Sequence, residues 1–181
     1  VSRGLGDVYK RQVYALWYVL QKRNFRYSSV SYSSLSSNVV YAQRVRTLED
    51  ALNSSQINCV DGSVLFASLL RAINITPVLV QTPGHMFVGY YTDDKRKNIT
   101  FLETTMIGDV DLDDFFPEEK LDSTKTTKSQ AEISRLTFEK SKQYATEKYL
   151  SVEKQVRSNQ PRYLFFEISK GVRSKVQPIG R

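Results

Sequence analysis

The central part of the chain, residues 58–105, has the sequence NCVDGSVLFASLLRAINITPVLVQTPGHMFVGYYTDDKRKNITFLETT. It contains the only cysteine of the protein, Cys59, the only histidine, His85, and an acidic residue, Glu103. Each of the three stands at the start or the end of a predicted element, because Cys59 opens a helix, His85 opens a strand and Glu103 ends the next strand. A thiol nucleophile, its base and the residue that orients the base would need this arrangement.

The same stretch predicts one buried helix followed by three short strands. The helix is apolar on two sides, which is typical of a central helix, and Pro77 prevents its continuation. The predicted ranges are 59–73 for the helix and 78–80, 85–91 and 99–103 for the strands, with a turn at 82–84. The last two strands are joined by a polar loop and should pair as an antiparallel hairpin. The expected fold class is α+β, with the central helix packed on a small antiparallel sheet.

The flanking segments predict further helices, a loop and a last strand. Apolar residues at helical spacing, including Trp17, predict an amphipathic helix in which Trp17 belongs to the core. Thr47, followed three residues later by an acid, is a typical cap of a short helix. The predicted ranges are a helix over 13–23, an irregular Ser/Tyr-rich loop over 27–37, a helix after Thr47, a long polar helix over 129–157 with Ile133, Leu136, Tyr144 and Leu150 as apolar positions, a strand over 163–168 and a basic extended end over 171–181.

Composition and charge exclude several classes of protein. The net charge is +7, and residues 122–181 alone carry thirteen basic and six acidic side chains. Lysines alternate with glutamates there, as on a solvated helix face, so we expect no nucleic-acid partner. No apolar run approaches the roughly 20 residues of a membrane span, and a single cysteine excludes an internal disulfide. The oligomeric state does not follow from these data.

The first residues differ in kind from the rest. Residues 6–12, GDVYKRQ, look like the translation of a transposon-end sequencing adapter, as found in shotgun environmental assemblies. We therefore expect residues 1–12 to be an artefact and the native chain before about residue 13 to be missing, although a genuine disordered terminus would look similar. Residues 13–121 form the expected core, and residues 122–181 add a long polar helix and a closing strand to the same domain.

Four aspartates between residues 109 and 114 suggest a calcium site. Their spacing lacks the glycine and the closing glutamate of a calcium loop. One cysteine and one histidine without paired partners also make a poor zinc set. We expect neither a metal nor a cofactor.

The chemistry of the central stretch favours a reactive thiol. At the first turn of a helix, unpaired N–H groups and the helix dipole stabilise a thiolate at Cys59 and can hold a developing oxyanion. His85 could take the thiol proton, and Glu103 could orient the imidazole. Taken singly, each residue has a plain structural alternative: an inert buried cysteine, a hydrogen-bonded strand histidine and a surface charge.

These motifs resemble the transglutaminase-like cysteine peptidase superfamily, which has a papain-like fold. The resemblance covers about residues 43–108. It rests on the Cys-x-Asp start of the helix at Cys59, on the Pro-Gly-His-Met-Phe-Val segment around His85, and on Leu102-Glu103-Thr104-Thr105. Glutamate stands where the family usually has aspartate, and Thr104 replaces the usual proline.

The resemblance implies a cysteine-dependent acyl-transfer enzyme that acts on a peptide or protein substrate, with Cys59, His85 and Glu103 as its triad. Hydrolysis is favoured over crosslinking, and the alternative is a catalytically inactive module kept for binding. Gln43 could supply a second oxyanion donor, and Trp17 could act similarly. Asp61 could contact the substrate or its oxyanion, or it could instead anchor the start of the helix. Arg44 and Arg46 could bind a substrate carboxylate.

Overall fold

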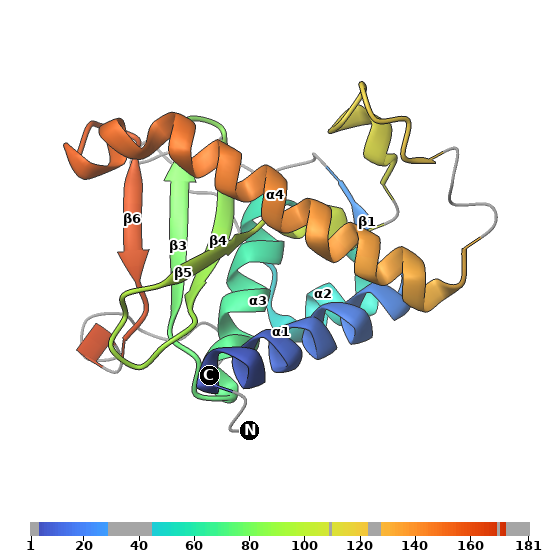
Figure 1. The fold of residues 1–181 in the computed structure, drawn as a ribbon, viewed down its shortest axis with the longest axis horizontal. Coiled ribbons are helices and arrows are strands. Elements are labelled where there is room, and N and C mark those ends of the chain that lie inside the picture. The colour runs from blue at the N-terminus through green and yellow to red at the C-terminus, as the bar shows by residue number, and fades with distance from the viewer. Residues whose placement is uncertain (1–3, 29–44, 109, 123–127, 170, 173–181) are drawn as a thin grey trace.

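A computed structural model describes residues 4–28, 45–108, 110–122, 128–169 and 171–172, and these form a mixed α+β fold (Figure 1). The elements are α1 (Leu5–Lys22), β1 (Arg26–Tyr27), α2 (Leu48–Ser54), β2 (Gln56–Ile57), α3 (Cys59–Ala72), β3 (Pro77–Thr82), β4 (His85–Tyr91), β5 (Ile99–Leu102), the 3-10 turns η1 (Thr104–Ile107) and η2 (Leu112–Asp114), α4 (Gln130–Arg157) and β6 (Leu164–Glu167). The predicted α+β class with a small antiparallel sheet is therefore confirmed.

The main sheet has the strand order β5-β4-β3-β6, and all its neighbours are antiparallel. β3 is an interior strand, as its continuous apolar run predicts. β4 and β5 form the expected hairpin, with Val88 opposite Leu102. The turn between β3 and β4 contains Gly84 at φ +76°, a left-handed conformation that glycine adopts without steric cost.

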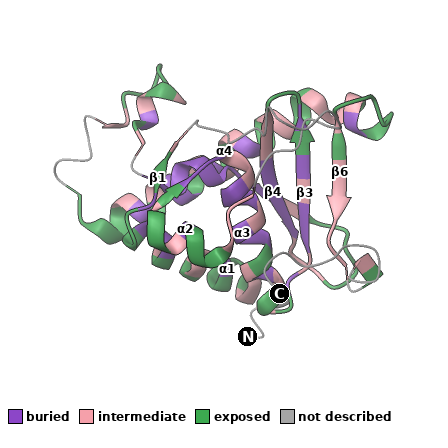
Figure 2. Cartoon of the chain, turned by 180° about the vertical axis from the view of Figure 1, so that it is seen from behind, coloured by how far each residue is buried: buried purple, intermediate pink, exposed green. Residues whose placement is uncertain are grey.

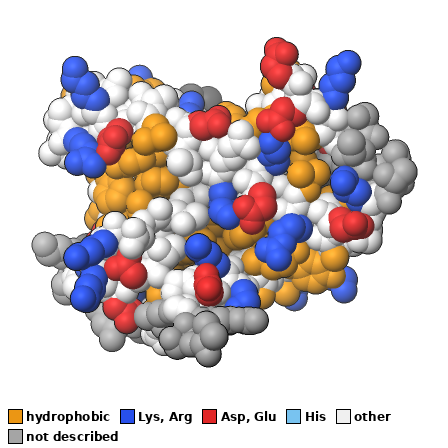
Figure 3. Space-filling model, in the orientation of Figure 1, with side chains coloured by type: hydrophobic (Ala, Val, Ile, Leu, Met, Phe, Trp, Pro, Cys, Tyr) orange, Lys and Arg blue, Asp and Glu red, His pale blue; other side chains and the backbone are white. Residues whose placement is uncertain are grey.

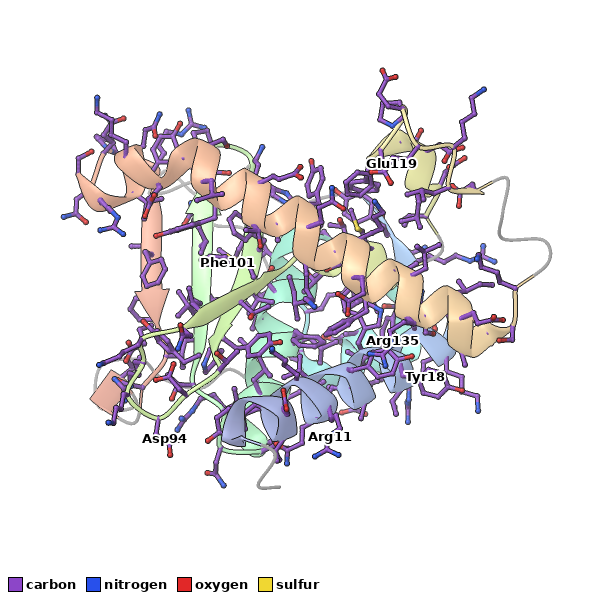
Figure 4. All side chains as sticks on the ribbon, in the orientation of Figure 1. Arg11, Tyr18, Asp94, Phe101, Glu119 and Arg135 are labelled. Atoms are coloured by element: carbon purple, nitrogen blue, oxygen red, sulfur yellow. The ribbon has the colours of Figure 1, made fainter. Side chains whose placement is uncertain are left out.

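Both faces of this sheet are covered, which explains why its strands are apolar throughout rather than alternating. One face carries Val88, Tyr90 and Leu102 and shares its hydrophobic core with α3. The opposite face carries Val78, Val80, Phe87 and Phe101, which pack with Ala145 and Val156 of α4. Figure 2 shows β3, β4 and much of α3 as buried, and Figure 4 shows Phe101 close to the point where α4 crosses the sheet.

The long helix α4 begins after Ser129, whose side chain accepts the N–H of Glu132 in a capping box. Three of its six buried residues are small polar ones. The buried residues of α4 are Ser134, Thr137, Phe138, Ser141, Ala145 and Val156. Leu150, predicted as an apolar contact, is instead exposed, because the buried side of α4 faces away from it.

The outer face of α4 is charged with both signs. Lys142 pairs with Glu139, and Arg157 pairs with Glu153. Figure 3 shows basic and acidic side chains interspersed on the visible face of the molecule. This is the pattern of a solvated helix face. None of the helices in the described part of the chain has the length and apolarity needed to cross a membrane.

The N-terminal helix is longer than predicted. α1 begins at Leu5 rather than at residue 13, and Tyr9 in this added part donates its hydroxyl to Asp94. Trp17 lies in the core as expected and is completely buried. α1 runs alongside the N-terminal half of α4 (Figure 1).

A short parallel pair joins the start of the chain to the segment before α3. Arg26 lies opposite Gln56, and Tyr27 lies opposite Ile57. The irregular loop predicted over 27–37 is therefore wrong at Tyr27, which is a strand residue, and most of that range lies outside the described residues. The predicted basic end, 171–181, also lies largely outside them, whereas the last predicted strand is present as β6, paired with β3.

Close packing of α3 on η1 generates a first prediction, because a Cβ added at Gly62 would lie 2.8 Å from Thr104 Oγ1 and 3.2 Å from Thr104 Cβ. Thr104 is completely buried and cannot move aside. Gly62→Ala should lower the free energy of unfolding by about 1–3 kcal/mol, although alanine favours helices by up to about 1 kcal/mol. Chemical denaturation measures the change.

A double-mutant cycle supplies the control. In a Thr104→Ala background, which removes the closest atom, Gly62→Ala should cost clearly less. A stabilised Gly62→Ala protein would mean that α3 and η1 are not in the close contact described.

Candidate active site

Cys59 is the first residue of α3, and its side chain is half-buried. The residue before it, Asn58, caps the helix. The Asn58 side-chain oxygen accepts the N–H groups of Val60 at 2.9 Å and Asp61 at 2.8 Å. The sequence prediction of a thiol at a helix N-terminus is thus confirmed in its geometry.

The first-turn N–H groups are not all open to a ligand, which corrects part of the prediction. Those of Val60 and Asp61 are occupied by Asn58, and the N–H of Gly62 donates to the Asn58 carbonyl at 2.9 Å. Among the described residues, this leaves the N–H of Cys59 itself as the first-turn donor for an oxyanion.

Asp61 anchors the helix start rather than facing a substrate. It is 2% exposed, and its carboxylate accepts the N–H of Asn58 at 3.3 Å and the N–H of Arg46 at 2.9 Å. The Arg46 guanidinium forms an ion pair with the same carboxylate. Asp61 and Arg46 therefore bind each other. This supports the anchoring role of Asp61 and does not support substrate contacts by either residue.

His85, the first residue of β4, lies between Cys59 and Glu103. Its Nε2 is 2.6 Å from Oε2 of Glu103, and because a carboxylate only accepts hydrogen bonds, Nε2 carries the proton. The side chain of Cys59 also acts on the imidazole, and its contribution raises the pKa of His85. With Nε2 used by Glu103, Nδ1 is the nitrogen left for the sulfur. The three side chains form one connected chain of contacts.

The alternation of side chains along β4 and β5 explains how His85 and Glu103 meet. Phe87 and Phe101 point to the face of the sheet that α4 covers, and His85 and Glu103 continue these two series by two residues each. The β4–β5 register ends at Val88 and Leu102, so His85 and Glu103 lie diagonally across the hairpin. The longer glutamate side chain spans this diagonal.

Glu103 is completely buried, and each of its polar groups has a partner. One carboxylate oxygen, Oε2, binds His85, while Oε1 accepts the Thr105 hydroxyl at 2.9 Å and the Thr105 N–H at 3.2 Å. Its backbone N–H donates to Ser141 Oγ at 2.8 Å, and Ser141 Oγ–H donates to its carbonyl at 3.1 Å. Such a network holds the carboxylate in one orientation.

The electrostatics of the site favour a charged imidazole. Burial on its own lowers the pKa of His85, but the hydrogen bonds to Cys59 and Glu103 and the charges of both groups outweigh it and raise the pKa to about 9. At neutral pH His85 is therefore an imidazolium, which is the charge that stabilises a neighbouring thiolate. The arrangement can transfer a proton between sulfur and a leaving group.

A buried hydroxyl connects the backbone around all three residues. Ser63 Oγ lies 2.7 Å from the carbonyl of Cys59, 3.2 Å from the carbonyl of Met86 and 3.4 Å from Thr104 Oγ1. Met86 follows His85, and Thr104 follows Glu103 in the sequence. One side chain in α3 therefore contacts the backbone or side chains next to each candidate catalytic residue.

Of three other predicted residues, Trp17 is not brought to this site, and two are not among the described residues. Trp17 is completely buried, and its indole N–H donates to Thr137 Oγ1 at 3.4 Å, so it is not available to a substrate. Gln43 and Arg44 lie outside the described residues.

The sequence did not predict that Tyr27, held in the short β1–β2 pair, lies near enough to Cys59 and Glu103 to respond to their charges. Burial raises the pKa of the Tyr27 phenol, and the charges of Cys59 and Glu103 raise it further. Its side chain is 42% exposed, so it borders the site. A strand of two residues leaves no periodic signal, and Ser141 was missed because a serine in a polar helix has none either.

The aspartates after η1 contribute to a separate cluster. Carboxylate oxygens of Asp111, Asp113 and Asp122 lie within 4.8 Å of one another. Asp111 and Asp122 accept the N–H of Asp113 at 2.9 and 3.3 Å, and Asp113 accepts that of Asp122 at 3.0 Å. The bond from Asp113 to Asp111 closes a backbone turn, which is an ordinary role for aspartate, and the other two join segments nine residues apart.

Comparison with known proteins gives no match, since no family model, no curated protein and no solved structure matches this chain.

The electrostatics predict the titration of His85, which nuclear magnetic resonance can follow without ambiguity because it is the only histidine. The imidazole should stay protonated through neutral pH and lose its proton only near pH 9. Glu103→Gln removes a charge and a charged hydrogen-bond acceptor, so it should lower this pKa, whereas the exposed Glu139→Gln should not. Titration of the wild-type imidazole near its ordinary value of 6.5 would contradict the described network.

The same shift predicts how stability depends on pH. Since the pKa is raised on folding, the contribution of His85 to stability is complete below pH 6.5 and is lost as the pH rises through about 9. The loss is on the order of 3 kcal/mol. Denaturation of the wild type and of His85→Gln should therefore give stabilities that converge between these two pH values, and a constant difference would count against the assignment.

Proposed function

We propose that this protein is a cysteine-dependent acyl-transfer enzyme, and specifically an amide or peptide hydrolase with a papain-like, transglutaminase-like fold. The observation that carries the proposal is the connected set of contacts from Cys59 through His85 to Glu103. Two features of the fold support the relationship to that superfamily. The helix α3 begins at Cys59 and packs on the antiparallel sheet, and the strand β4 begins at His85. The buried carboxylate supports it further, since its longer side chain still reaches the imidazole.

The proposed reaction starts with attack by the Cys59 thiolate on an amide carbonyl carbon. A carbon–sulfur bond forms, and the negative charge moves to the carbonyl oxygen, where the Cys59 N–H can stabilise it. The carbon–nitrogen bond then breaks as the His85 imidazolium gives its proton to the departing amine. An acyl-thioester and a neutral imidazole remain.

Water completes the cycle. The neutral imidazole takes a proton from water as the oxygen attacks the thioester, and the carbon–sulfur bond breaks to release the acid and restore the thiolate. Throughout, Glu103 accepts the Nε2 hydrogen, which keeps Nδ1 directed at the sulfur. No cofactor enters this scheme.

Acylation of Cys59 tests the proposal directly. With p-nitrophenyl acetate as a probe, the wild type should release nitrophenol and carry an acetyl group on Cys59, detected by intact mass. Cys59→Ala should lose labelling and turnover by about 10³-fold or more while its circular dichroism is unchanged, because the side chain is only half-buried. Glu103→Gln should slow acylation by about 10²-fold, and Glu139→Gln should not.

Quenched fluorescent peptides distinguish the hydrolase from the alternative. Cleavage that depends on Cys59 supports a peptidase. A folded protein whose Cys59 is neither acylated by the ester nor required for peptide cleavage would instead be a binding module without catalytic activity.

A further inference from the structure

Ser141 makes an unusual pair of contacts for a serine in a helix. It lies in α4, is completely buried, and is 38 residues away from Glu103 in the sequence. Its hydroxyl accepts the N–H of Glu103 at 2.8 Å and donates to the carbonyl of the same residue at 3.1 Å. The Glu103 carbonyl also accepts the N–H of Met106 at 3.2 Å, so Ser141 is the partner of the backbone N–H and one of two partners of the carbonyl.

These two backbone groups lie beyond the regular sheet. The register of β5 with β4 ends at Leu102, and η1 begins at Thr104. Glu103 itself is completely buried, so water cannot replace a lost partner without a change of structure. The position of its backbone in turn sets the position of its carboxylate, which lies 2.6 Å from the imidazole.

The other hydroxyls of the same kind are used differently. Thr137, one turn earlier in α4, donates to the Ile133 carbonyl at 3.0 Å, and Ser68 in α3 donates to the Val64 carbonyl at 2.8 Å. These two bonds stay within their own helix, which is the common behaviour of such residues. Thr137 Oγ1 additionally accepts the side-chain N–H groups of Gln21 at 2.9 Å and Trp17 at 3.4 Å. The hydroxyl of Ser141 bonds Glu103 instead. Tyr144, three residues later in α4, is also affected by Glu103. Burial raises the pKa of the Tyr144 phenol, and the charge of Glu103 raises it further.

We propose that Ser141 is a positioning residue of the catalytic site: it fixes the backbone of Glu103 so that the carboxylate meets His85, and it makes α4 part of the active site. The effect on catalysis rests on the proposed function of Cys59. The effect on the imidazole does not, since it concerns only Ser141, Glu103 and His85.

A matched pair of variants tests this. Ser141→Ala removes the two bonds, and Ser134→Ala removes the hydroxyl of another completely buried serine of α4, two turns away, whose partner is Gln130 at 3.5 Å. In Ser141→Ala the pKa of His85, followed by nuclear magnetic resonance, should fall by about one unit, and acetylation of Cys59 should slow by about 10-fold. Ser134→Ala should match the wild type in both measurements. Ser141→Thr keeps a hydroxyl and should recover most of both losses.

Three results would overturn the inference. One is an unchanged His85 titration in folded Ser141→Ala, and another is an equal shift in Ser134→Ala, which would reflect a general loosening of α4. The third uses the wild type alone and decides the matter if Ser141→Ala does not fold. The resonances of Ser141 should move together with the His85 titration, and resonances that stay constant through it would show that the serine is not coupled to the triad.

The titration also separates this inference from the proposed function. If Cys59 is inert but the His85 pKa falls in Ser141→Ala alone, the positioning role stands without catalysis. If Cys59 is acylated normally in Ser141→Ala and the His85 pKa is unchanged, the proposed function stands and the positioning role is wrong.

Discussion

The buried carboxylate of Glu103 constrains the architecture around it. Removing a charge from water is costly unless hydrogen bonds and an opposite charge replace the lost hydration. Here His85 supplies the charge, Thr105 supplies two donors, and Ser141 bonds the backbone N–H and carbonyl. These groups come from β4, from η1 and from α4, so the carboxylate can be accommodated only when all three have assembled. The contacts that stabilise the buried carboxylate are therefore the same contacts that hold the proposed catalytic geometry.

The nucleophile is tied to this arrangement through α3. Asn58 and Asp61 form a capping box at the start of the helix, and Arg46 forms an ion pair with Asp61. These contacts fix the position of the first turn. Gly62 and Ser63 then bring the helix against Thr104 and the start of β4. The helix dipole stabilises an anionic Asp61 at the helix start, and the ion pair with Arg46 balances its charge.

Sequence reasoning located the candidate residues where the signals were local. A polar cap before an apolar run predicts the start of α3, and a proline and a glycine delimit β3 and β4. Contacts between distant segments carry no such signal. Ser141 and Thr137 face the interior from a helix whose sequence is polar, and Tyr27 reaches the site through a two-residue strand pair. The roles of Asp61 and Arg46 were also undecided from sequence, since a cap, an ion pair and a substrate contact all use the same residue types.

The central claim is that a protonated His85 keeps Cys59 in its reactive form, and the rate of alkylation by iodoacetamide as a function of pH tests it most directly. At neutral pH the wild type should be alkylated about tenfold faster or more than His85→Gln, because an imidazolium beside the sulfur favours the thiolate, which is the form that is alkylated. In His85→Gln the rate should be low at the acid end and rise about tenfold per pH unit towards the region where ordinary thiols ionise, about pH 8.5. The same rising profile in both proteins would show that His85 does not act on the sulfur, and the account would be wrong.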